Sequence, residues 1–211
     1  MDQIRATYNA VLAGDTAAVV ASVRAALSEK IPAEKILGAG LIEAMNEVGT
    51  RFESGEMYVP EMLIAARAMQ SGLGILRPHL TESGVKALGK VVIGTVKGDL
   101  HDIGKNLVAM MLEGAGFEVI DLGTDVPPER FAAAVRQHAP DIVGMSALLT
   151  TTMVNMRATL EAIEDIGLRK KVKVIIGGAP VTEDFAHQIG ADSYAADAGT
   201  AARLAKALIA K

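Results

Sequence analysis

The pattern of apolar residues changes once along the chain, between residues 78 and 91. Before that point, apolar side chains recur at the three- and four-residue spacing of amphipathic helices. After it, short apolar runs bounded by glycine and polar residues alternate with helical patterns. The sequence therefore predicts a helical domain over residues 1–78, a linker over 79–90 and an α/β domain over 91–211.

Four helical segments are expected in the first domain. The first ends at Gly14, and Asp15 is a good N-cap for the second. The third has apolar residues at helical spacing, namely Leu37, Leu41, Met45, Val48 and Phe52. The sequence SGE at 54–56 breaks this pattern, and the fourth helix starts near Pro60. Helices with such short connections predict a small four-helix bundle.

The apolar runs of the second domain have the length and composition of buried strands. They span residues 91–96, 117–123, 141–147, 172–178 and 191–196. A helical pattern follows each run, which is typical of a doubly wound parallel sheet. Five such units favour the flavodoxin-like strand order 2-1-3-4-5 over a six-stranded Rossmann fold. The predicted fold class is α/β, a four-helix bundle followed by a flavodoxin-like (Rossmann-like) five-stranded parallel sheet.

Composition narrows the class of protein. The chain has 211 residues, a net charge of −4 and no basic block, so nucleic-acid binding is not expected. Cysteine is absent, which excludes disulfides and thiolate metal sites and fits a reducing compartment. No apolar stretch is long enough to span a bilayer, and the N-terminal MDQIRATYNA lacks the pattern of a signal peptide. We expect a soluble cytoplasmic protein with no membrane or nucleic-acid partner.

The expected topology locates the ligand site before any motif is considered. Ligands of such sheets bind at the carboxyl ends of the strands, near the switch point between the first and third strands. The loop after the first strand reads KGDLHDIG (97–104), and the loop after the third begins SALLTTT (146–152). The fourth strand ends in Gly177-Gly178. These three loops should therefore meet at one edge of the sheet.

The loops at this edge do not match the sequence motifs of phosphate-binding or zinc sites. A P-loop needs four residues between its glycines, whereas five separate Gly98 from Gly104, and Asn106 stands where Ser or Thr holds magnesium. No G-x-G-x-x-G fingerprint follows the first strand. A zinc site needs three or four protein ligands, and no second histidine lies near His101 in the sequence. A metal held in a macrocycle, which leaves only axial positions open, meets the remaining requirement.

The loops carry a three-part motif: Asp99-x-His101-x-x-Gly104, Ser146-x-Leu148 and Gly177-Gly178. This motif resembles the D-x-H-x-x-G…S-x-L…G-G signature of cobalamin-binding domains. The segment VGTRFESGEMYVPEMLIAARAM (48–69) is similar to the helical cap of methionine synthase and of the small corrinoid proteins of methyltransferase systems. The resemblance covers nearly the whole chain. It implies cobalamin or a related corrinoid as the cofactor, with methylcobalamin as the loaded state.

The resemblance implies a role in cobalt ligation for three residues. His101 is the lower axial ligand in place of the cofactor's own base, which gives the base-off, His-on state. Asp99 accepts a hydrogen bond from the other ring nitrogen and fixes the tautomer. Thr152 stands where methionine synthase has a serine, and its hydroxyl completes a proton relay. Two plainer interpretations stay open: a surface histidine beside an acid for His101, and a helix N-cap for Thr152.

Further matching positions are implied to bind the rest of the cofactor. They are Gly98, Asp102, Ile103 and Gly104 in the first loop, Ser146, Leu148 and Thr150 in a narrow slot between the first and third strands, Gly177 and Gly178 beside the descending tail, and Ala198 in the last loop. Asp102 can instead cap the helix expected over 104–115, and the double glycine can instead form a tight turn.

The cap is implied to cover the upper face of the cobalt. Phe52 and Val59 match two bulky cap residues, although Val59 is smaller than the leucine expected there. Met57, Tyr58 and Met62 either assist or belong to the core of the bundle. Since the cofactor must meet two other enzymes, the cap is expected to move on a hinge at 78–90.

The implied function is that of a non-catalytic methyl carrier. A substrate-specific methyltransferase methylates Co(I), and a second methyltransferase, with tetrahydrofolate or a thiol as acceptor, removes the methyl group from methyl-Co(III). A reductive activating protein restores chains that have oxidised to Co(II). The alternatives are the small subunit of an adenosylcobalamin mutase, which generally lacks this cap, and a cobalamin sensor, which needs an output module. The methyl donor is set by the partner enzyme.

Overall fold

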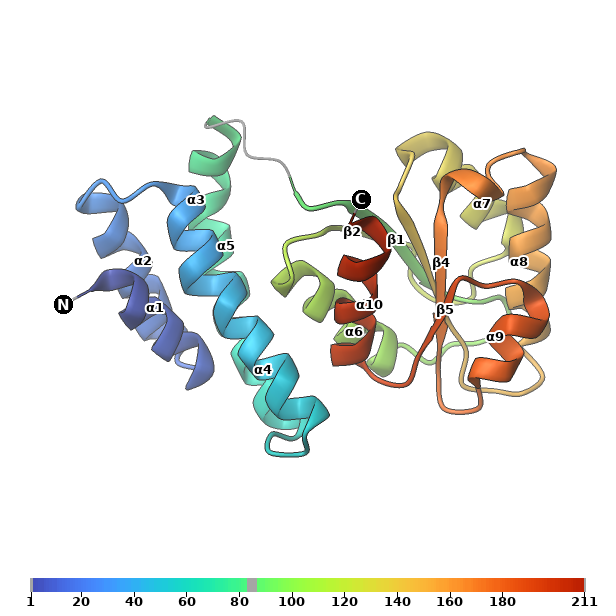
Figure 1. The fold of residues 1–211 in the computed structure, drawn as a ribbon, viewed down its shortest axis with the longest axis horizontal. Helices are drawn as coiled ribbons and strands as arrows, with labels where there is room; N and C mark the ends of the chain where they lie inside the picture. Colours follow the sequence, from blue (N-terminus) through green and yellow to red (C-terminus); the bar gives the residue numbers. More distant parts are fainter. Residues whose placement is uncertain (1, 83–86, 211) are drawn as a thin grey trace. The chain divides into compact units, whose positions relative to one another are not determined.

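The computed structural model describes residues 2–82 and 87–210, and the chain divides into two compact units. One unit is helical, and the other, which begins at Ala87, contains the sheet (Figure 1). The predicted fold class is confirmed, because a helical N-terminal part precedes a parallel α/β sheet. No helix in the described part of the chain combines the length and the apolar character needed to cross a bilayer.

The first two helices begin where capping residues predict. Helix α1 (Gln3–Leu12) follows Asp2, whose carboxylate accepts a hydrogen bond from the Ile4 amide at 3.0 Å. Helix α2 (Thr16–Ser28) follows Asp15, whose carboxylate accepts from the Ala18 amide at 2.9 Å. Each side chain satisfies one of the amides that the first helical turn leaves unpaired.

The third predicted helix contains an irregular segment. It runs through α3 (Ala33–Lys35), the π-helical segment η1 (Ile36–Ile42) and α4 (Glu43–Glu53). The amide of Glu43 donates to the Gly38 carbonyl five residues earlier, which is the bonding pattern of a π-helix. The regular helical spacing of the apolar residues gave no sign of this widened turn.

The fourth helix is longer than the sequence predicts. Helix α5 (Val59–Glu82) continues through Pro78, where we expected it to end, so the predicted linker 79–90 begins as helix. Residues 83–86 of that linker, and with them the centre of the predicted hinge, lie outside the described residues. Proline removes one backbone donor near the end of α5 without ending the helix.

Five strands in the described residues form one parallel sheet in the predicted order, β2-β1-β3-β4-β5. They are β1 (Lys90–Thr95), β2 (Glu118–Asp121), β3 (Ile142–Ser146), β4 (Lys173–Gly177) and β5 (Ser193–Ala195). The register places four residues in one row at the carboxyl edge: Thr95, Ser146, Gly177 and Ala195. The ends of the first, third and fourth strands therefore meet at this edge, as predicted.

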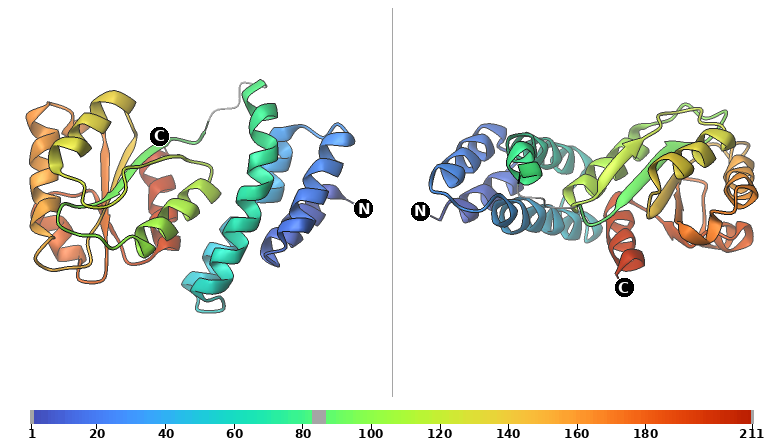
Figure 2. Two further views of the ribbon diagram at one scale, coloured as in Figure 1. Left: turned by 180° about the vertical axis from the view of Figure 1, so that it is seen from behind. Right: turned by 90° about the horizontal axis from the view of Figure 1, so that it is seen from above.

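Helices cover both faces of the sheet (Figures 1 and 2). Helices α7 (Pro128–His138) and α8 (Val154–Asp165) lie on one face together with α9 (Glu183–Ile189), because all three contribute to the same buried cluster. Helices α6 (Ile103–Gly114) and α10 (Ala198–Ile209) lie on the other face. The short 3-10 turn η2 (Arg169–Lys171) precedes β4.

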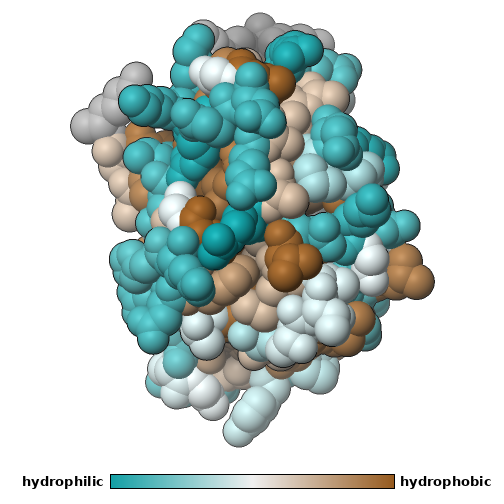
Figure 3. Space-filling view, turned by 90° about the vertical axis from the view of Figure 1, so that its right-hand side faces the viewer, coloured by the Kyte–Doolittle hydropathy of each residue, from teal (hydrophilic) through white to brown (hydrophobic). Residues whose placement is uncertain are grey.

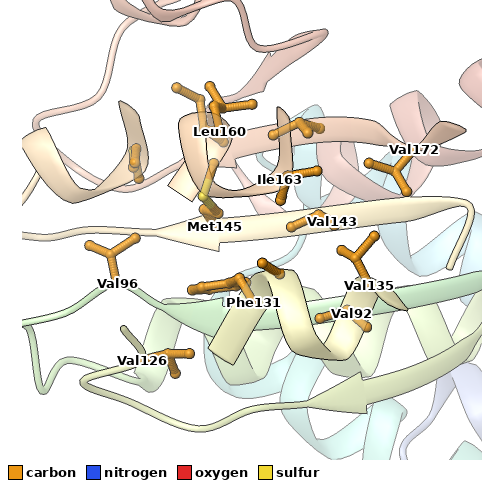
Figure 4. Packing of buried hydrophobic residues seen from close by; sticks show 14 of the residues in the cluster. Val92, Val96, Val126, Phe131, Val135, Val143, Met145, Leu160, Ile163 and Val172 are labelled. Atoms are coloured by element: carbon orange, nitrogen blue, oxygen red, sulfur yellow. The ribbon is translucent and has the colours of Figure 1, made fainter. Parts of the chain in front are cut away.

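Alternate strand residues fill the core beneath α7 and α8 (Figure 4). Val92 and Val143 are fully buried on neighbouring strands, and Phe131 of α7 and Ile163 of α8 pack on the same cluster with no exposed surface. The outer side seen in Figure 3 is mostly hydrophilic, with brown atoms in small separate groups. The helices of this side are therefore amphipathic, with their apolar residues turned to the sheet.

Asp192, directly before β5, forms hydrogen bonds with residues at the amino end of β4 and in the turn before it. Its carboxylate accepts from the Val174 amide at 2.8 Å, from Arg169 Nη2 at 2.7 Å and from Lys173 Nζ at 3.3 Å. Burial alone raises the pKa of Asp192, but the hydrogen bonds from Val174 and Arg169, with the charge of Arg169, outweigh it and lower the pKa below its ordinary value.

We expect Asp192→Asn to lower the free energy of unfolding by about 1–2 kcal/mol near neutral pH, because a partly exposed charge-assisted hydrogen bond is lost. Since the folded pKa is lowered, this contribution is complete above the pKa of Asp in an unfolded chain, about 3.9, and is lost as pH falls through the folded value. In urea unfolding, the difference in free energy of unfolding between the wild type and Asp192→Asn should be constant from about pH 7 to 5 and smaller below about pH 3.5. A gap that does not change with pH contradicts this assignment, and Asp165→Asn, at an exposed position in α8, is the matched control.

Candidate functional site

The loop between β1 and α6 carries the predicted ligand, His101. Gly98 turns the chain with a φ of 80°, a left-handed value that suits glycine, directly after β1. Asp99 follows with no exposed surface, whereas the His101 side chain is 53% exposed. The loop thus buries the acid and presents the imidazole at the carboxyl edge of the sheet, where parallel α/β folds bind their ligands.

One carboxylate oxygen of Asp99 orients His101. Oδ1 lies 2.7 Å from Nδ1 of the imidazole and also accepts the His101 amide at 3.1 Å. Because an ionised carboxylate only accepts hydrogen bonds, the ring proton lies on Nδ1. The lone pair of the neutral ring then lies on Nε2, which is the arrangement found in histidine ligands of metals.

The other oxygen of Asp99 is bound by the loop after β3. Oδ2 accepts from the amides of Leu148 at 2.7 Å and Leu149 at 3.2 Å, and from the Thr152 hydroxyl at 2.9 Å. A buried carboxylate requires such donors, since an unpaired charge inside a protein is costly. Asp99 therefore connects the loops after the first and third strands, two of the three that the motif predicted to meet.

Electrostatics keep this acid ionised. Burial alone raises the pKa of Asp99, but hydrogen bonds from the Leu148 amide, from the ring and amide of His101 and from Thr152 hold the pKa of this carboxyl well below its usual range. Asp99 is therefore an anion at neutral pH. It can hold the Nδ1 proton firmly and make Nε2 a stronger donor to a metal.

Thr152 is placed for the predicted relay. Its hydroxyl lies 2.9 Å from Asp99 Oδ2 and 2.8 Å from the Leu149 carbonyl oxygen. One hydroxyl proton serves only one of these acceptors at a time. Helix α8 starts at Val154, and its cap residue Met153 makes no side-chain hydrogen bond. The hydroxyl of Thr152 thus binds Asp99 rather than capping α8, while its part in proton transfer stays a prediction.

The double glycine has a structural explanation within the protein. A Cβ at Gly178 would lie 1.8 Å from the carbonyl oxygen of Ala147, and one at Gly177 would lie 2.8 Å from the carbonyl oxygen of Ala195. The loops after β3 and β4 thus approach more closely than any side chain permits. The residues predicted to line the slot lie beside them: Ser146 is half-buried and Leu148 and Thr150 are exposed. Ala198 is buried at the start of α10.

The side chains next to His101 in the sequence are exposed, and several of them are apolar. A Cβ built on Gly104 meets no heavy atom within 4 Å, so this side of the loop is open. The loops that meet at Asp99 carry exposed apolar side chains, with Leu100 at 73%, Ile103 at 78% and Leu148 at 42% exposure. Apolar residues gathered in this way commonly mark a binding surface.

Asp102 does not cap α6 in the expected manner. Its carbonyl accepts the Asn106 amide at 2.7 Å, but its carboxylate accepts from the Asn106 side chain at 3.1 Å. Lys105, which is 2% exposed, forms an ion pair with Asp121 and donates to Asn106 Oδ1 at 2.6 Å. Asp102 and Asn106 thus form a side-chain pair at the start of α6, and Asp102 is exposed.

The predicted cap residues belong to the helical unit. Phe52 is half-buried near the end of α4, and Val59, the first residue of α5, is 38% exposed. Tyr58 is 70% exposed, whereas Met57 and Met62 are buried among the helices. Met62, with no exposed surface, is therefore a core residue, and the covering role of Phe52 and Val59 stays a prediction.

Three polar residues at the site were not predicted. The Thr95 hydroxyl donates to the His101 carbonyl at 2.8 Å, Asp125 Oδ1 accepts the Gly98 amide at 2.7 Å, and Asn155 Nδ2 donates to the Lys97 carbonyl at 2.8 Å. Thr95 could have been found as the last residue of the first strand. Asp125 and Asn155 gave no signal, because they lie in other segments and bind only backbone atoms.

A buried acid that orients an exposed histidine at the switch point of a flavodoxin-like sheet defines a cobalamin-binding α/β protein. Residues 89–206 match the family described as B12 binding domain, and residues 3–77 match a second family with the same description. The first match covers more than half of the chain. The chain therefore belongs to the B12-binding corrinoid proteins, and its cofactor is cobalamin or a related corrinoid.

Similar proteins agree with this assignment. The chain is 43% identical to dimethylamine corrinoid protein 3 of Methanosarcina acetivorans over 201 residues, which is 95% of this chain and 94% of that protein. A crystal structure of a cobalamin-binding protein from Desulfitobacterium hafniense matches with a TM-score of 0.81 and 36% identity, over 97% of this chain and 98% of that one. A chain of the methanol:cobalamin methyltransferase complex MtaBC from Methanosarcina barkeri matches with a TM-score of 0.84 and 31% identity, over 99% and 80%.

Proposed function

We propose that this protein is the methyl carrier of a corrinoid-dependent methyltransferase system. It takes a methyl group from a substrate-specific methyltransferase and gives it to a second methyltransferase that uses a thiol or tetrahydrofolate. The observation that carries the proposal is the buried Asp99, which binds His101 Nδ1 at 2.7 Å and so directs Nε2 to a metal. Both B12 binding domain matches, which together span the helical and the α/β parts, favour a carrier over a mutase subunit.

The residues of the site have separate tasks in this proposal. A bound corrinoid supplies the cobalt that takes up and releases the methyl group. His101 would hold the cobalt through Nε2, in place of the cofactor's own base. Asp99, whose lowered pKa keeps it ionised, accepts the hydrogen bond from Nδ1 and so holds the imidazole in one orientation.

Proton movement at the lower face follows from the same contacts. If His101 were released from a bound cobalt, Nε2 would be free to accept a proton, and a protonated ring would form an ion pair with Asp99 through the existing Nδ1 contact. Thr152, bound to Oδ2 of the same carboxylate, can turn its hydroxyl between Asp99 and the Leu149 carbonyl. This pair of acceptors lets the hydroxyl adjust to the charge of the histidine.

The methyl donor is proposed to be a methylated amine. The relatives that support this are named dimethylamine and trimethylamine corrinoid proteins, at 43–47% identity, whereas the methanol complex matches at 31%. The partners are then an amine methyltransferase, a second methyltransferase and a reductive activating protein. The cytoplasm is the proposed compartment.

The test is a methyl-transfer assay with defined partners. Protein loaded with hydroxocobalamin and reduced with titanium(III) citrate is mixed with dimethylamine and a dimethylamine methyltransferase, or with methanol and a methanol methyltransferase. We expect the absorbance of the reduced cofactor to disappear only when an amine and its enzyme are both present. If the protein binds the cofactor but neither the amine enzyme nor the methanol enzyme methylates it, the proposed carrier function is contradicted. If only the methanol enzyme methylates it, the proposed amine donor is contradicted.

A further inference from the structure

Several backbone groups of the loop that carries His101, in Lys97, Gly98, Asp99 and His101, form hydrogen bonds. The Asp99 amide donates to the Val96 carbonyl at 3.1 Å, and the His101 carbonyl accepts from the Thr95 hydroxyl at 2.8 Å. The first bond is made by Val96, which follows β1, and the second by Thr95, the last residue of β1. The His101 amide binds Asp99 Oδ1 within the loop, and the other backbone contacts come from Asp125 and Asn155 in other segments.

Asp125 binds the loop on both sides of the peptide bond between Gly98 and Asp99. Its Oδ1 accepts the Gly98 amide at 2.7 Å, and its own amide donates to the Asp99 carbonyl at 2.9 Å. Asp125 also has a φ of 51°, a left-handed conformation that is uncommon for residues other than glycine. Such strain persists only where the surrounding structure enforces it, and it concentrates at functional sites.

The neighbour of Asp125 fixes this conformation. Val126 pairs with Val96 in a short parallel bridge, and its amide donates to the Thr95 carbonyl at 3.0 Å. The segment after β2 therefore extends the sheet by one bridge next to the ligand loop. From that position, the backbone of Asp125 must turn left-handed to bring both its amide and its carboxylate to the loop.

Asn155 binds the loop from another segment of the chain. It lies in the first turn of α8, three residues after Thr152, and its Nδ2 donates to the Lys97 carbonyl at 2.8 Å. Two side chains at or just before the start of α8 thus bind one loop: Thr152, which precedes the helix, binds the Asp99 carboxylate, and Asn155 binds the backbone just before Asp99. A donor is required at this position, because the group it meets is a carbonyl.

We propose that Asp125 and Asn155 are positioning residues that fix the ligand loop, so that His101 Nε2 is already aimed at cobalt before the cofactor binds. The proposal rests on the proposed role of His101 as a cobalt ligand and adds two residues that set the strength of the His101–cobalt bond. A loop without these contacts has more conformations, and ordering it on cofactor binding costs free energy that a preformed loop does not lose. This free-energy cost should weaken the bond between His101 and cobalt, because that bond needs the imidazole in one place.

The two contacts need opposite groups: position 125 must accept a hydrogen bond from an amide, and position 155 must donate one to a carbonyl. Asn at position 125 keeps the oxygen that accepts the Gly98 amide, and asparagine tolerates a left-handed φ. We therefore expect Asp125→Asn to behave like the wild type and Asp125→Ala to lose the contact. At position 155 the isosteric Asn155→Asp removes the donor and places an acceptor against the Lys97 carbonyl, so it should lose the contact.

The test measures the ratio of histidine-bound to histidine-free cofactor in the cobalt(II) state by electron paramagnetic resonance, with cobalamin as the probe. Asp125→Ala and Asn155→Asp should each lower this ratio by about tenfold, the factor that corresponds to about 1.4 kcal/mol and to the loss of one hydrogen bond. Asp125→Asn and the exposed control Asp165→Ala should leave the ratio unchanged. Amide exchange at Gly98 in the cofactor-free protein should become faster in Asp125→Ala alone among the variants at position 125.

The possible outcomes separate this proposal from the one beneath it. Wild-type protein in which His101 is not bound to cobalt overturns the ligand assignment, and the positioning role falls with it. Wild-type protein with bound histidine, together with an unchanged ratio in folded Asp125→Ala and Asn155→Asp, overturns the positioning role alone. An Asp125→Asn variant as impaired as Asp125→Ala shows that charge, not the hydrogen bond, is what the loop needs, and also contradicts the proposal.

Discussion

Replacing His101 with alanine should abolish histidine coordination and weaken cobalamin binding by more than about 100-fold. Loss of a partner that only orients a metal ligand typically costs 10–100-fold in affinity or activity, so loss of the ligand itself should cost more. Asp99→Asn, which keeps the shape but not the charge that holds the Nδ1 proton, should fall within about 10–100-fold. Equilibrium dialysis of cobalamin measures both variants.

His187→Ala is the matched control for this series, because His187 is an exposed histidine in α9, within the same unit of the chain. It should bind cobalamin as the wild type does. A His101→Ala variant with wild-type affinity and an unchanged absorption spectrum would show that His101 is a surface histidine beside an acid, which is the plainer interpretation of the motif.

Gly178→Ala should lower the free energy of unfolding by about 3–5 kcal/mol, through overpacking and backbone strain together. The added Cβ would lie 1.8 Å from the Ala147 carbonyl oxygen, and φ at this position is 128°. Backbone atoms cannot move aside as a flexible side chain can, so the loop after β3 must shift. Because the amides of Leu148 and Leu149 in that loop bind Asp99, cobalamin affinity should fall as well.

Gly190→Ala separates the clash from the strain. Gly190 also has a positive φ, 80°, but a Cβ there meets no heavy atom within 4 Å. It should cost only about 1–2 kcal/mol, the penalty of the left-handed backbone, and leave cobalamin binding unchanged. Urea unfolding of both variants decides the matter, and equal destabilisation would mean that the close approach of the two loops has no energetic importance.

Much of the α/β unit could be predicted because its signals are local. Each strand is a short apolar run, and alternation of strands with helices restricts the topology to a few parallel orders. The same topology brings the loops after β1, β3 and β4 to one edge, so a histidine in one loop and a threonine in another could be assigned to one site. The contact of Asp99 with both His101 and Thr152 is the result.

What could not be predicted depends on contacts between distant segments. The left-handed φ of Asp125 arises from the bridge between Val96 and Val126, which no local pattern specifies. The place of Gly178 beside the cofactor tail stays a prediction, but the sequence gave no sign that a Cβ there would meet the carbonyl oxygen of Ala147. The π-helical turn Ile36–Ile42 likewise left the spacing of apolar residues almost unchanged.

The most direct test of the central claim is the electron paramagnetic resonance spectrum of the cobalt(II) state in protein labelled with ¹⁵N only at histidine. If His101 Nε2 binds cobalt, the superhyperfine pattern of each cobalt line should change from the triplet of ¹⁴N to the doublet of ¹⁵N, and His101→Ala should remove it. A triplet that persists in the labelled protein would show that the cofactor's own base is still the lower ligand, and would contradict the account given for His101 and Asp99.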